Sequence, residues 1–249
     1  MTDAVRLEGV SKRYGSIVAL REVDLLVPEG AFLSVFGPNG AGKTTLLAVL
    51  ATIARPTEGR VAVFGHDTLA DGALVRSQVG LVSHDSFAYD NLTALENLLF
   101  YGRLYGIGDA GERSHDMLDS LGLYGRRNDL VCHFSQGMRQ RLAIARALLH
   151  DPRLLLLDEP FSGLDIHAAS TLSELLASFY SERRTVVMAT HRLEEGLSLS
   201  DRLAILASGR LVFERPTAGL SADALQEIYL RHVGITNVFQ EERGSRRRP

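Results

Sequence analysis

The stretch GPNGAGKT, residues 37–44, decides the fold of this chain. It matches the pattern G-x-x-x-x-G-K-[ST] and stands between an expected strand at 31–37 and an expected helix at 44–54, which is the context that the pattern requires. Glycines let the backbone fold tightly around phosphates, so that amide groups and the helix N-terminus point at negative charge. The pattern arises by chance in only ~1% of chains of this length, so a phosphate-binding loop is favoured over a simple glycine turn before a helix.

This P-loop predicts a site for a nucleoside triphosphate. Lys43 can reach the β- and γ-phosphates, and the Thr44 hydroxyl can bind Mg²⁺. The lysine is informative because, of the 27 basic residues, only Lys12 and Lys43 are lysines. The residues expected to bind the nucleotide here are Gly37, Pro38, Asn39, Gly40, Ala41, Gly42, Lys43, Thr44 and Thr45.

A second element is LLLLDEP, residues 154–160, in which an apolar strand ends in two acidic residues. Such residues lie at the carboxyl edge of a parallel sheet, where ligands of open α/β folds bind. Asp158 would hold Mg²⁺, directly or through water, and Glu159 would polarise the attacking water. On its own, an acidic strand end could equally be the start of a loop or a helix cap. The P-loop upstream favours the catalytic interpretation.

The rest of the chain alternates between strand and helix patterns, which predicts an α/β fold: a P-loop NTPase core with a mostly parallel sheet. Helical periodicity over about 88–150 predicts an inserted helical subdomain, and strands over about 1–35 and 58–78 predict an antiparallel β subdomain. We expect a single domain over 1–236 and a basic, flexible tail over 237–249. Strands are expected at 5–10, 19–27, 31–37, 61–65, 79–83, 154–158, 185–190, 202–207 and 210–215, and a helix at 166–181.

Composition places further limits on function. The chain of 249 residues has a formal net charge of −3, and its single cysteine, Cys132, excludes an internal disulfide and fits a reducing compartment. No apolar run approaches the ~18 to 20 residues needed to span a bilayer, and the polar N-terminus lacks the apolar core of a signal peptide. The sequence has no concentrated basic face, so we expect no nucleic acid as a partner. These features predict a soluble cytoplasmic protein.

The order of several motifs resembles the nucleotide-binding subunits of ABC transporters. The P-loop is followed by FSQGM at 134–138, LLLLDEP at 154–160, SGLD at 162–165 and His191 after TVVMAT. The P-loop and the acidic strand occur in many NTPases, whereas FSQGM followed closely by LLLLDEP and SGLD is specific to this family. The resemblance runs from about residue 4 to 215.

The resemblance implies roles for residues outside the P-loop. Tyr14 would stack on the adenine ring, and His191 would contact the γ-phosphate and complete a catalytic set with Glu159 and Lys43. Without the family, Tyr14 could be an ordinary strand-end residue, His191 a cap or a packed residue, and SGLD a turn and N-cap before the next helix. The dimer loop, which in this family crosses between subunits beside the attacking water, would consist of Ser162, Gly163, Leu164 and Asp165.

The FSQGM segment resembles the family's signature sequence, whose commonest form is LSGGQ. In this family the segment begins a helix, and its serine and glycine amides face the γ-phosphate of ATP bound to the other subunit. Ser135 would cap the helix and Gly137 would permit close approach, with the helix dipole favouring the anion. Gln136 and Met138 replace the third and fifth residues of the common form. The residues expected to face the partner's ATP are Ser135, Gln136, Gly137 and Met138.

A second departure from the family is His84, in VGLVSHDSF, where most members have a glutamine at the end of the strand. That glutamine ordinarily touches Mg²⁺ or its water and reports the nucleotide state to the membrane subunit. A neutral imidazole can accept such a hydrogen bond or bind a metal, although oxygen donors suit Mg²⁺ better. We therefore expect His84 to lie near the nucleotide as a coupling-loop residue.

The resemblance implies ATP hydrolysis by a head-to-tail dimer, with Mg²⁺ held by Thr44 and Asp158. The second ATPase subunit is expected to be another copy of this chain. Integral membrane subunits would move the cargo and hold the pair on the inner, cytoplasmic face of the cell membrane. Similarity over 82–152 favours an exporter, with haem export in cytochrome c maturation as the first interpretation. The alternatives are a drug or antibiotic exporter and, less favoured, a soluble ATPase switch.

Overall fold

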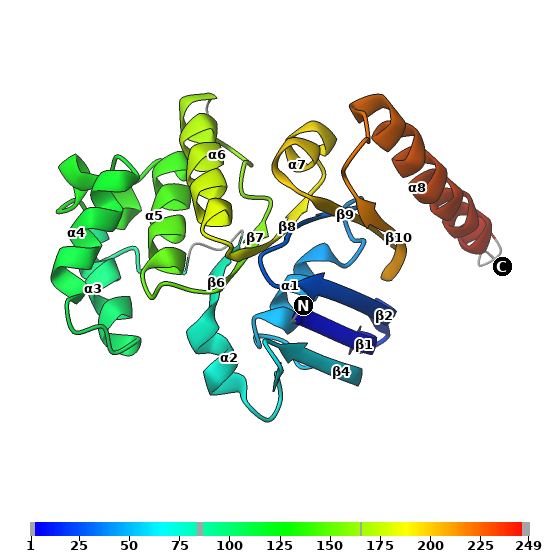
Figure 1. Ribbon diagram of the computed structural model, residues 1–249, viewed down its shortest axis with the longest axis horizontal. Helices are drawn as coiled ribbons and strands as arrows, with labels where there is room; N and C mark the ends of the chain where they lie inside the picture. The colour runs from blue at the N-terminus through cyan, green and yellow to red at the C-terminus, as the bar shows by residue number, and fades with distance from the viewer. Residues whose placement is uncertain (1–2, 84–86, 165, 246–249) are drawn as a thin grey trace.

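The computed structural model describes residues 3–83, 87–164 and 166–245, and for residues 166–167 and 235–245 it describes the backbone alone. Its larger sheet has the order β10-β9-β3-β8-β7-β6 (Figure 1). All neighbouring strands in it are parallel except β9 and β10, which pair antiparallel, so the predicted α/β class with a mostly parallel sheet is confirmed. Its strands are β3 (Phe32–Phe36), β6 (Val79–Val82), β7 (Leu154–Asp158), β8 (Thr185–Thr190), β9 (Arg202–Ala207) and β10 (Arg210–Pro216).

The leucines of β7 explain why this sheet is buried on both faces. Leu154 and Leu156 pack into a hydrophobic cluster with α1 (Lys43–Leu50) and the smaller sheet, whereas Leu155 and Leu157 pack into a second cluster on the opposite face. Successive side chains of a strand point to opposite faces, so covering both faces requires an unbroken apolar run instead of an alternating one. The second cluster includes residues of α5 (Gln136–Leu148) and α6 (Ile166–Ser181).

The smaller sheet is antiparallel and has the order β2-β1-β4-β5. Its strands are β1 (Asp3–Tyr14), β2 (Ile17–Pro28), β4 (Glu58–Val63) and β5 (His66–Asp67). The first antiparallel segment therefore ends at Pro28, and the expected limit of about residue 35 is too late. The physical reason is that β3 is buried along its whole length and joins the parallel sheet.

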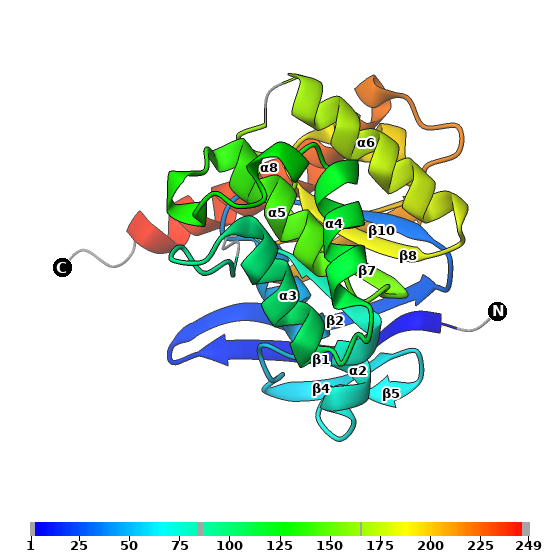
Figure 2. The same ribbon diagram turned by 90° about the vertical axis from the view of Figure 1, so that its left-hand side faces the viewer.

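The helices α3 (Ala94–Leu104), α4 (Ala110–Ser120) and α5 lie together on one side of the parallel sheet (Figure 2). A capping box begins α3: Thr93 Oγ1 accepts a hydrogen bond from the Glu96 amide, and Glu96 accepts one from the Thr93 amide. These hydrogen bonds lower the pKa of Glu96. The other elements before α5 are α2 (Gly72–Gln78) and two 3-10 helices, Tyr124–Arg126 and Val131–His133.

A third cluster joins the carboxyl end of the sheet to α7 (Leu193–Leu199) and α8 (Ala222–Ser245). Figure 1 shows α8 running away from the body of the molecule. Its backbone is helical to Ser245, so the first part of the segment expected to be a flexible tail is helical. Among the residues that the structure describes, no helix is both long enough and apolar enough to cross a membrane.

Candidate active site

Three neighbouring strands bring the predicted catalytic residues to one edge. The strands β3, β8 and β7 are adjacent and parallel, so their carboxyl ends meet. The P-loop follows β3, Glu159 follows β7, and His191 follows β8. This placement is the ligand-binding edge of an open α/β sheet.

The P-loop depends on glycine at two close approaches. A Cβ on Gly37 would lie 2.3 Å from the Leu206 carbonyl oxygen, and a Cβ on Gly42 would lie 2.4 Å from the Ala19 carbonyl oxygen. Gly42 also has a φ of 108°, a conformation that favours glycine. It is the N-cap of α1 and supplies no side-chain cap, so the first amides of the helix keep their capacity to bind an anion.

Glu159 is in direct contact with both Lys43 and His191. Lys43 Nζ lies 3.5 Å from Glu159 Oε1, and His191 Nδ1 lies 2.8 Å from Glu159 Oε2. Lys43 is only 7% exposed and donates a 2.7 Å hydrogen bond to the Gly37 carbonyl. The glutamate adopts a φ of 50°, and its amide donates to the Ala189 carbonyl, so the turn after β7 is tied to β8. The structure thus brings these three predicted residues into one cluster.

Oxygen donors suited to Mg²⁺ come from the same edge. Asp158 is 5% exposed at the end of β7, and Thr44 is exposed in the first turn of α1. A carboxylate and a hydroxyl are hard ligands, and Mg²⁺ commonly takes few protein ligands and completes its shell with water and phosphate oxygens. Within the described ranges no group of three or more acidic, histidine or cysteine residues forms a metal cage. The residues present therefore fit a Mg²⁺ ion that arrives with the nucleotide.

Tyr14 ends β1 with 49% of its surface exposed. Lys12 Nζ lies 4.7 Å from the centre of the Tyr14 ring, which is a cation–π contact. The β1–β2 hairpin approaches the P-loop, because Ala19 of β2 lies against Gly42. Stacking of Tyr14 on adenine stays a prediction.

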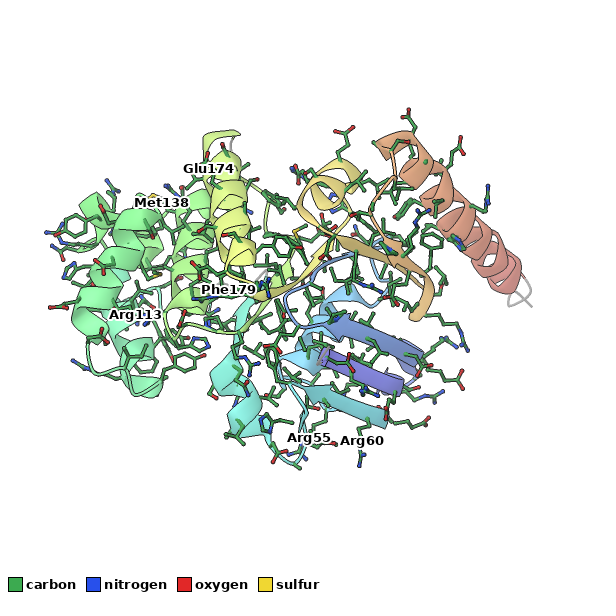
Figure 3. All side chains as sticks on the ribbon, viewed as in Figure 1. Arg55, Arg60, Arg113, Met138, Glu174 and Phe179 are labelled. Carbon is green, nitrogen blue, oxygen red and sulfur yellow. The ribbon has the colours of Figure 1, made fainter. Side chains whose placement is uncertain are left out.

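The predicted signature residues begin α5. Ser135 is the N-cap, and its Oγ accepts a 3.3 Å hydrogen bond from the Met138 amide (Figure 3 marks Met138). The side chain of Gln136 lies against Gly163 in the predicted dimer loop, and Leu164 lies beside Gly137. Ser135, Ser162 and Gly163 are exposed. The start of α5 and the described part of the dimer loop therefore form one exposed surface. Their contact with a partner's ATP stays a prediction.

Two predicted residues cannot be placed, and two residues near Glu159 were not predicted. His84 and Asp165 lie outside the described residues. Sequence reasoning overlooked Gln140, which donates a 3.2 Å hydrogen bond to the Pro160 carbonyl beside the catalytic turn. Its spacing of four residues from Gln136 was the available signal. It also overlooked Tyr229 of α8, whose pKa is raised by burial and then by the charge of Glu159.

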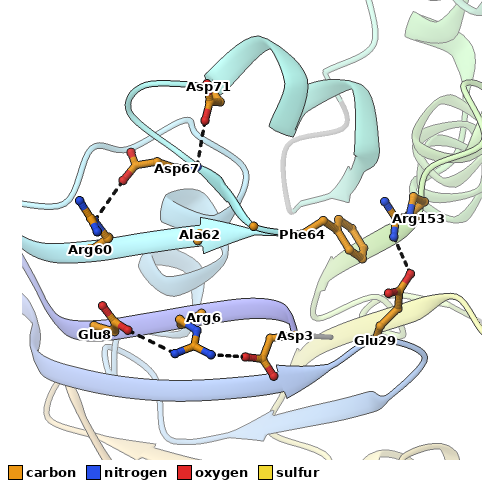
Figure 4. A pocket seen from close by; sticks show the side chains of 11 residues that line it. Asp3, Arg6, Glu8, Glu29, Arg60, Ala62, Phe64, Asp67, Asp71 and Arg153 are labelled. Atoms are coloured by element: carbon orange, nitrogen blue, oxygen red, sulfur yellow. Dashed lines mark hydrogen bonds and ion pairs between the residues drawn. The ribbon is translucent and has the colours of Figure 1, made fainter. Parts of the chain in front are cut away.

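A cavity of about 630 Å³ lies elsewhere (Figure 4). It is lined by β1, β4 and residues that precede β3 and β7, at the amino ends of the parallel strands. Its three arginines are all paired with acidic residues of the lining: Arg6 with Asp3 and Glu8, Arg60 with Asp67, and Arg153 with Glu29. This position, opposite the P-loop edge, separates the cavity from the catalytic cluster.

The chain is similar in sequence to proteins of a known family. The family described as "ABC transporter" matches residues 20–162. The ABC transporter ATP-binding protein NatA of Bacillus subtilis is 38% identical over 79% of this chain and 81% of the relative. A daunorubicin resistance ATP-binding protein of Streptomyces coeruleorubidus is 37% identical over 93% of this chain and 75% of the relative. The Nod factor export ATP-binding protein I of Rhizobium johnstonii is 37% identical over 86% of this chain and 70% of the relative.

A solved structure is similar in fold. It is a dimeric, post-hydrolysis state of the ATP-binding cassette MJ0796 bound to ADP and Pi. The TM-score is 0.81 with 31% identity, over 87% of this chain and all of that chain. The predicted P-loop NTPase fold is confirmed by this likeness.

Proposed function

The chain belongs to the ABC transporter family as an ATP-binding subunit with ATPase activity, and from that premise we propose that it energises a drug or antibiotic exporter. The observation that carries the choice of an exporter is the pair of relatives whose names concern daunorubicin resistance and Nod factor export. Similarity to the daunorubicin resistance protein extends over 93% of this chain, well beyond the nucleotide motifs.

The catalytic cluster supports a division of labour in hydrolysis. Lys43 is held by the Gly37 carbonyl and Glu159, and on ATP binding it exchanges these partners for β- and γ-phosphate oxygens. Glu159 then accepts a proton from the water whose oxygen attacks the γ-phosphorus, as the bond to the β-phosphate oxygen breaks to give ADP and phosphate. His191 orients the Glu159 carboxylate through its 2.8 Å contact.

Magnesium would be held by Thr44 and Asp158, and it would neutralise charge that develops on the phosphate oxygens. Tyr14 would bind the adenine ring on the face that Lys12 leaves open. These assignments follow the placement of the P-loop, the end of β7 and the end of β1.

The second half of each site would come from another copy of this chain. The exposed start of α5 offers amides and the positive end of a helix dipole to an anion. The dimeric MJ0796 structure supports pairing of two copies, since it is similar to this chain over 87% of its length. Separate integral membrane subunits would complete the transporter and recruit the pair to the inner face of the membrane.

Haem export, our first interpretation of the cargo, is not supported. Two of the relatives reported above have names that concern drug resistance and Nod factor export, and these fit the alternative of a drug or antibiotic exporter better. Similarity over 82–152 was a poor guide to cargo because that region contains no residue that would touch it.

The test uses daunorubicin as a probe in a strain of the source organism from which this gene has been deleted. We expect the deletion to raise cellular daunorubicin, the wild-type gene to restore export, and Glu159→Gln to fail while the protein accumulates normally. The content of c-type cytochromes should not change. Unchanged drug accumulation, or a loss of c-type cytochromes, would overturn the proposed cargo class.

Membrane association is tested separately. Solubilised native membranes should yield integral membrane proteins that co-purify with the tagged chain and stimulate its ATPase activity. Recovery of the chain entirely without integral membrane proteins would favour the soluble ATPase switch.

A further inference from the structure

Two glutamines on one face of α5 contact the turn that carries Glu159. Gln136 and Gln140, the glutamine pair, are four residues apart and so lie one helical turn from each other on the same side. Gln140 Nε2 donates a 3.2 Å hydrogen bond to the Pro160 carbonyl. The amide of Gln136 lies over Gly163, so closely that a Cβ on Gly163 would be 2.6 Å from Gln136 Nε2. The pair therefore contacts the turn near both of its ends.

The turn itself is tightly wound. Glu159 has a φ of 50° and Gly163 a φ of 72°, two left-handed conformations within five residues. The Ser162 amide donates a 3.0 Å hydrogen bond to the Glu159 carbonyl, which closes the turn. A displacement of Gly163 is thus passed to Glu159 through a short, hydrogen-bonded stretch of backbone.

We propose that Gln136 is a positioning residue that makes the Glu159 turn and the start of α5 move as one unit. This inference rests on the proposed head-to-tail dimer, in which Glu159 serves the ATP of its own subunit and the start of α5 faces the ATP of the partner. The amide of Gln136 then transmits the state of one site to the other through Gly163. Gln140 supports it by fixing Pro160 to the same helix.

This arrangement depends on a departure from the common signature. Where the commonest form has glycine at the third position, this chain has Gln136, whose side chain reaches across to the glycine of the dimer loop. The contact requires Gly163 to lack a side chain. It also turns the Gln136 side chain toward its own subunit, so that the amides of the α5 start are left for the partner's phosphate.

The first test is Gln136→Ala in the full chain, with steady-state hydrolysis of Mg-ATP as the measurement. We expect kcat to fall by about tenfold with KM changed less than twofold, because the variant misplaces Glu159 without touching the P-loop. The thermal midpoint should stay within about 2 °C of wild type. The matched control is Gln78→Ala on α2. Gln78 accepts a hydrogen bond from Arg153 and does not contact the turn, so this variant should leave kcat unchanged.

The second test asks whether Gln136 and Gly163 act together. Gly163→Ala should lower kcat about as much as Gln136→Ala, and the double variant should be no worse than either single variant. Gly219→Ala controls for backbone strain, because Gly219 has a φ of 74° but no atom within 4 Å of its Cβ position. Losses that multiply in the double variant, or a kcat for Gln136→Ala within twofold of wild type, would overturn the proposal.

A third measurement separates this inference from the proposed dimer. In the Glu159→Gln background, ATP should convert the chain from monomer to dimer on size-exclusion chromatography, with or without Gln136→Ala. If the Glu159→Gln parent forms no dimer, the proposed function fails. If the parent dimerises and Gln136→Ala raises KM instead of lowering kcat, the proposed function stands and the positioning role of Gln136 is wrong.

Discussion

His150 should make the stability of the folded protein depend on pH. It joins the helical part to the parallel sheet: its ring stacks on Tyr105 with centroids 3.9 Å apart, and its Nε2 lies 3.1 Å from the Val79 carbonyl oxygen. Burial lowers the pKa of His150 from 6.5 to about 4, assisted by the charges of Arg146 and Arg113 and opposed by the Val79 carbonyl and Asp151. The folded protein therefore holds His150 neutral over a range in which the unfolded chain protonates it.

The sign and size of the effect follow from this pKa difference. Between pH 6.5 and 4 the unfolded chain binds more protons than the folded protein, so the free energy of unfolding falls as the pH falls through this window. At a pH below both pKa values, the depressed pKa of His150 would lower the free energy of unfolding by about 3 kcal/mol. Between pH 7.5 and 5.0 the loss is at most about 2 kcal/mol, because pH 5.0 lies about 1.5 pH units below the unfolded pKa and each unit contributes about 1.4 kcal/mol. For a chain of this length that loss lowers the thermal midpoint by roughly 4 to 8 °C.

The assay compares wild type with His150→Gln by urea and thermal unfolding at pH 7.5 and at pH 5.0. Other groups titrate in both proteins, so the difference between the two pH dependences isolates the imidazole. The variant should be less stable than wild type at pH 7.5, because it loses the stack on Tyr105, and it should lose less stability on acidification. Identical pH dependences would refute the assignment of a depressed pKa to His150.

Three further predictions concern the catalytic edge. Glu159→Gln should lower the rate of ATP hydrolysis at least a hundredfold while nucleotide binding persists, which stopped-flow hydrolysis and equilibrium binding of a fluorescent ATP analogue would check; a wild-type rate would exclude Glu159 as the base. Gly42→Ala should weaken ATP binding at least tenfold, because its Cβ would meet the Ala19 carbonyl. Gly40→Ala should weaken binding less, because no atom lies within 4 Å of its Cβ position. Equal losses of ATP affinity in the two variants would contradict the steric argument. Tyr14→Ala should weaken ATP binding by about tenfold and Tyr14→Phe by less than twofold, measured by calorimetry; equal affinities of Tyr14→Ala and wild type would rule out stacking on the base.

Much of the fold could be predicted because its signals are local. The apolar run of 154–157 is long enough for a strand and lacks alternation, which predicts burial on both faces, and the two hydrophobic clusters that share its leucines explain why. The P-loop pattern likewise places Lys43 at the start of a helix without knowledge of the rest of the chain. Contact of Lys43 with Glu159 is possible because β3 and β7 lie on either side of β8 in the sheet, with their carboxyl ends at the same edge.

The remaining features depend on tertiary contacts that no local pattern reports. The limit of the antiparallel part was misplaced because β3 is short and fully buried, and its partners β8 and β9 come from the far end of the sequence. The stack of His150 on Tyr105 joins two helical segments whose mutual orientation the sequence does not give. The cargo is harder still to predict, since the role proposed for the residues at the catalytic edge concerns ATP.

The exposed start of α5 shows why a single chain is an incomplete catalyst in the proposed mechanism. Ser135 Oγ accepts a hydrogen bond from the Met138 amide, and this bond satisfies only one of the four amides that a helix start leaves without an intrahelical partner. The catalytic cluster, by contrast, already occupies the charges of Lys43 and Glu159 with each other. ATP bound at the P-loop separates that pair and presents a γ-phosphate whose charge needs further donors, and the start of α5 in a second copy supplies donors of the right sign. Dimerisation should therefore depend on the triphosphate and weaken steeply when hydrolysis removes the γ-phosphate, because the attraction between the two surfaces leaves with it.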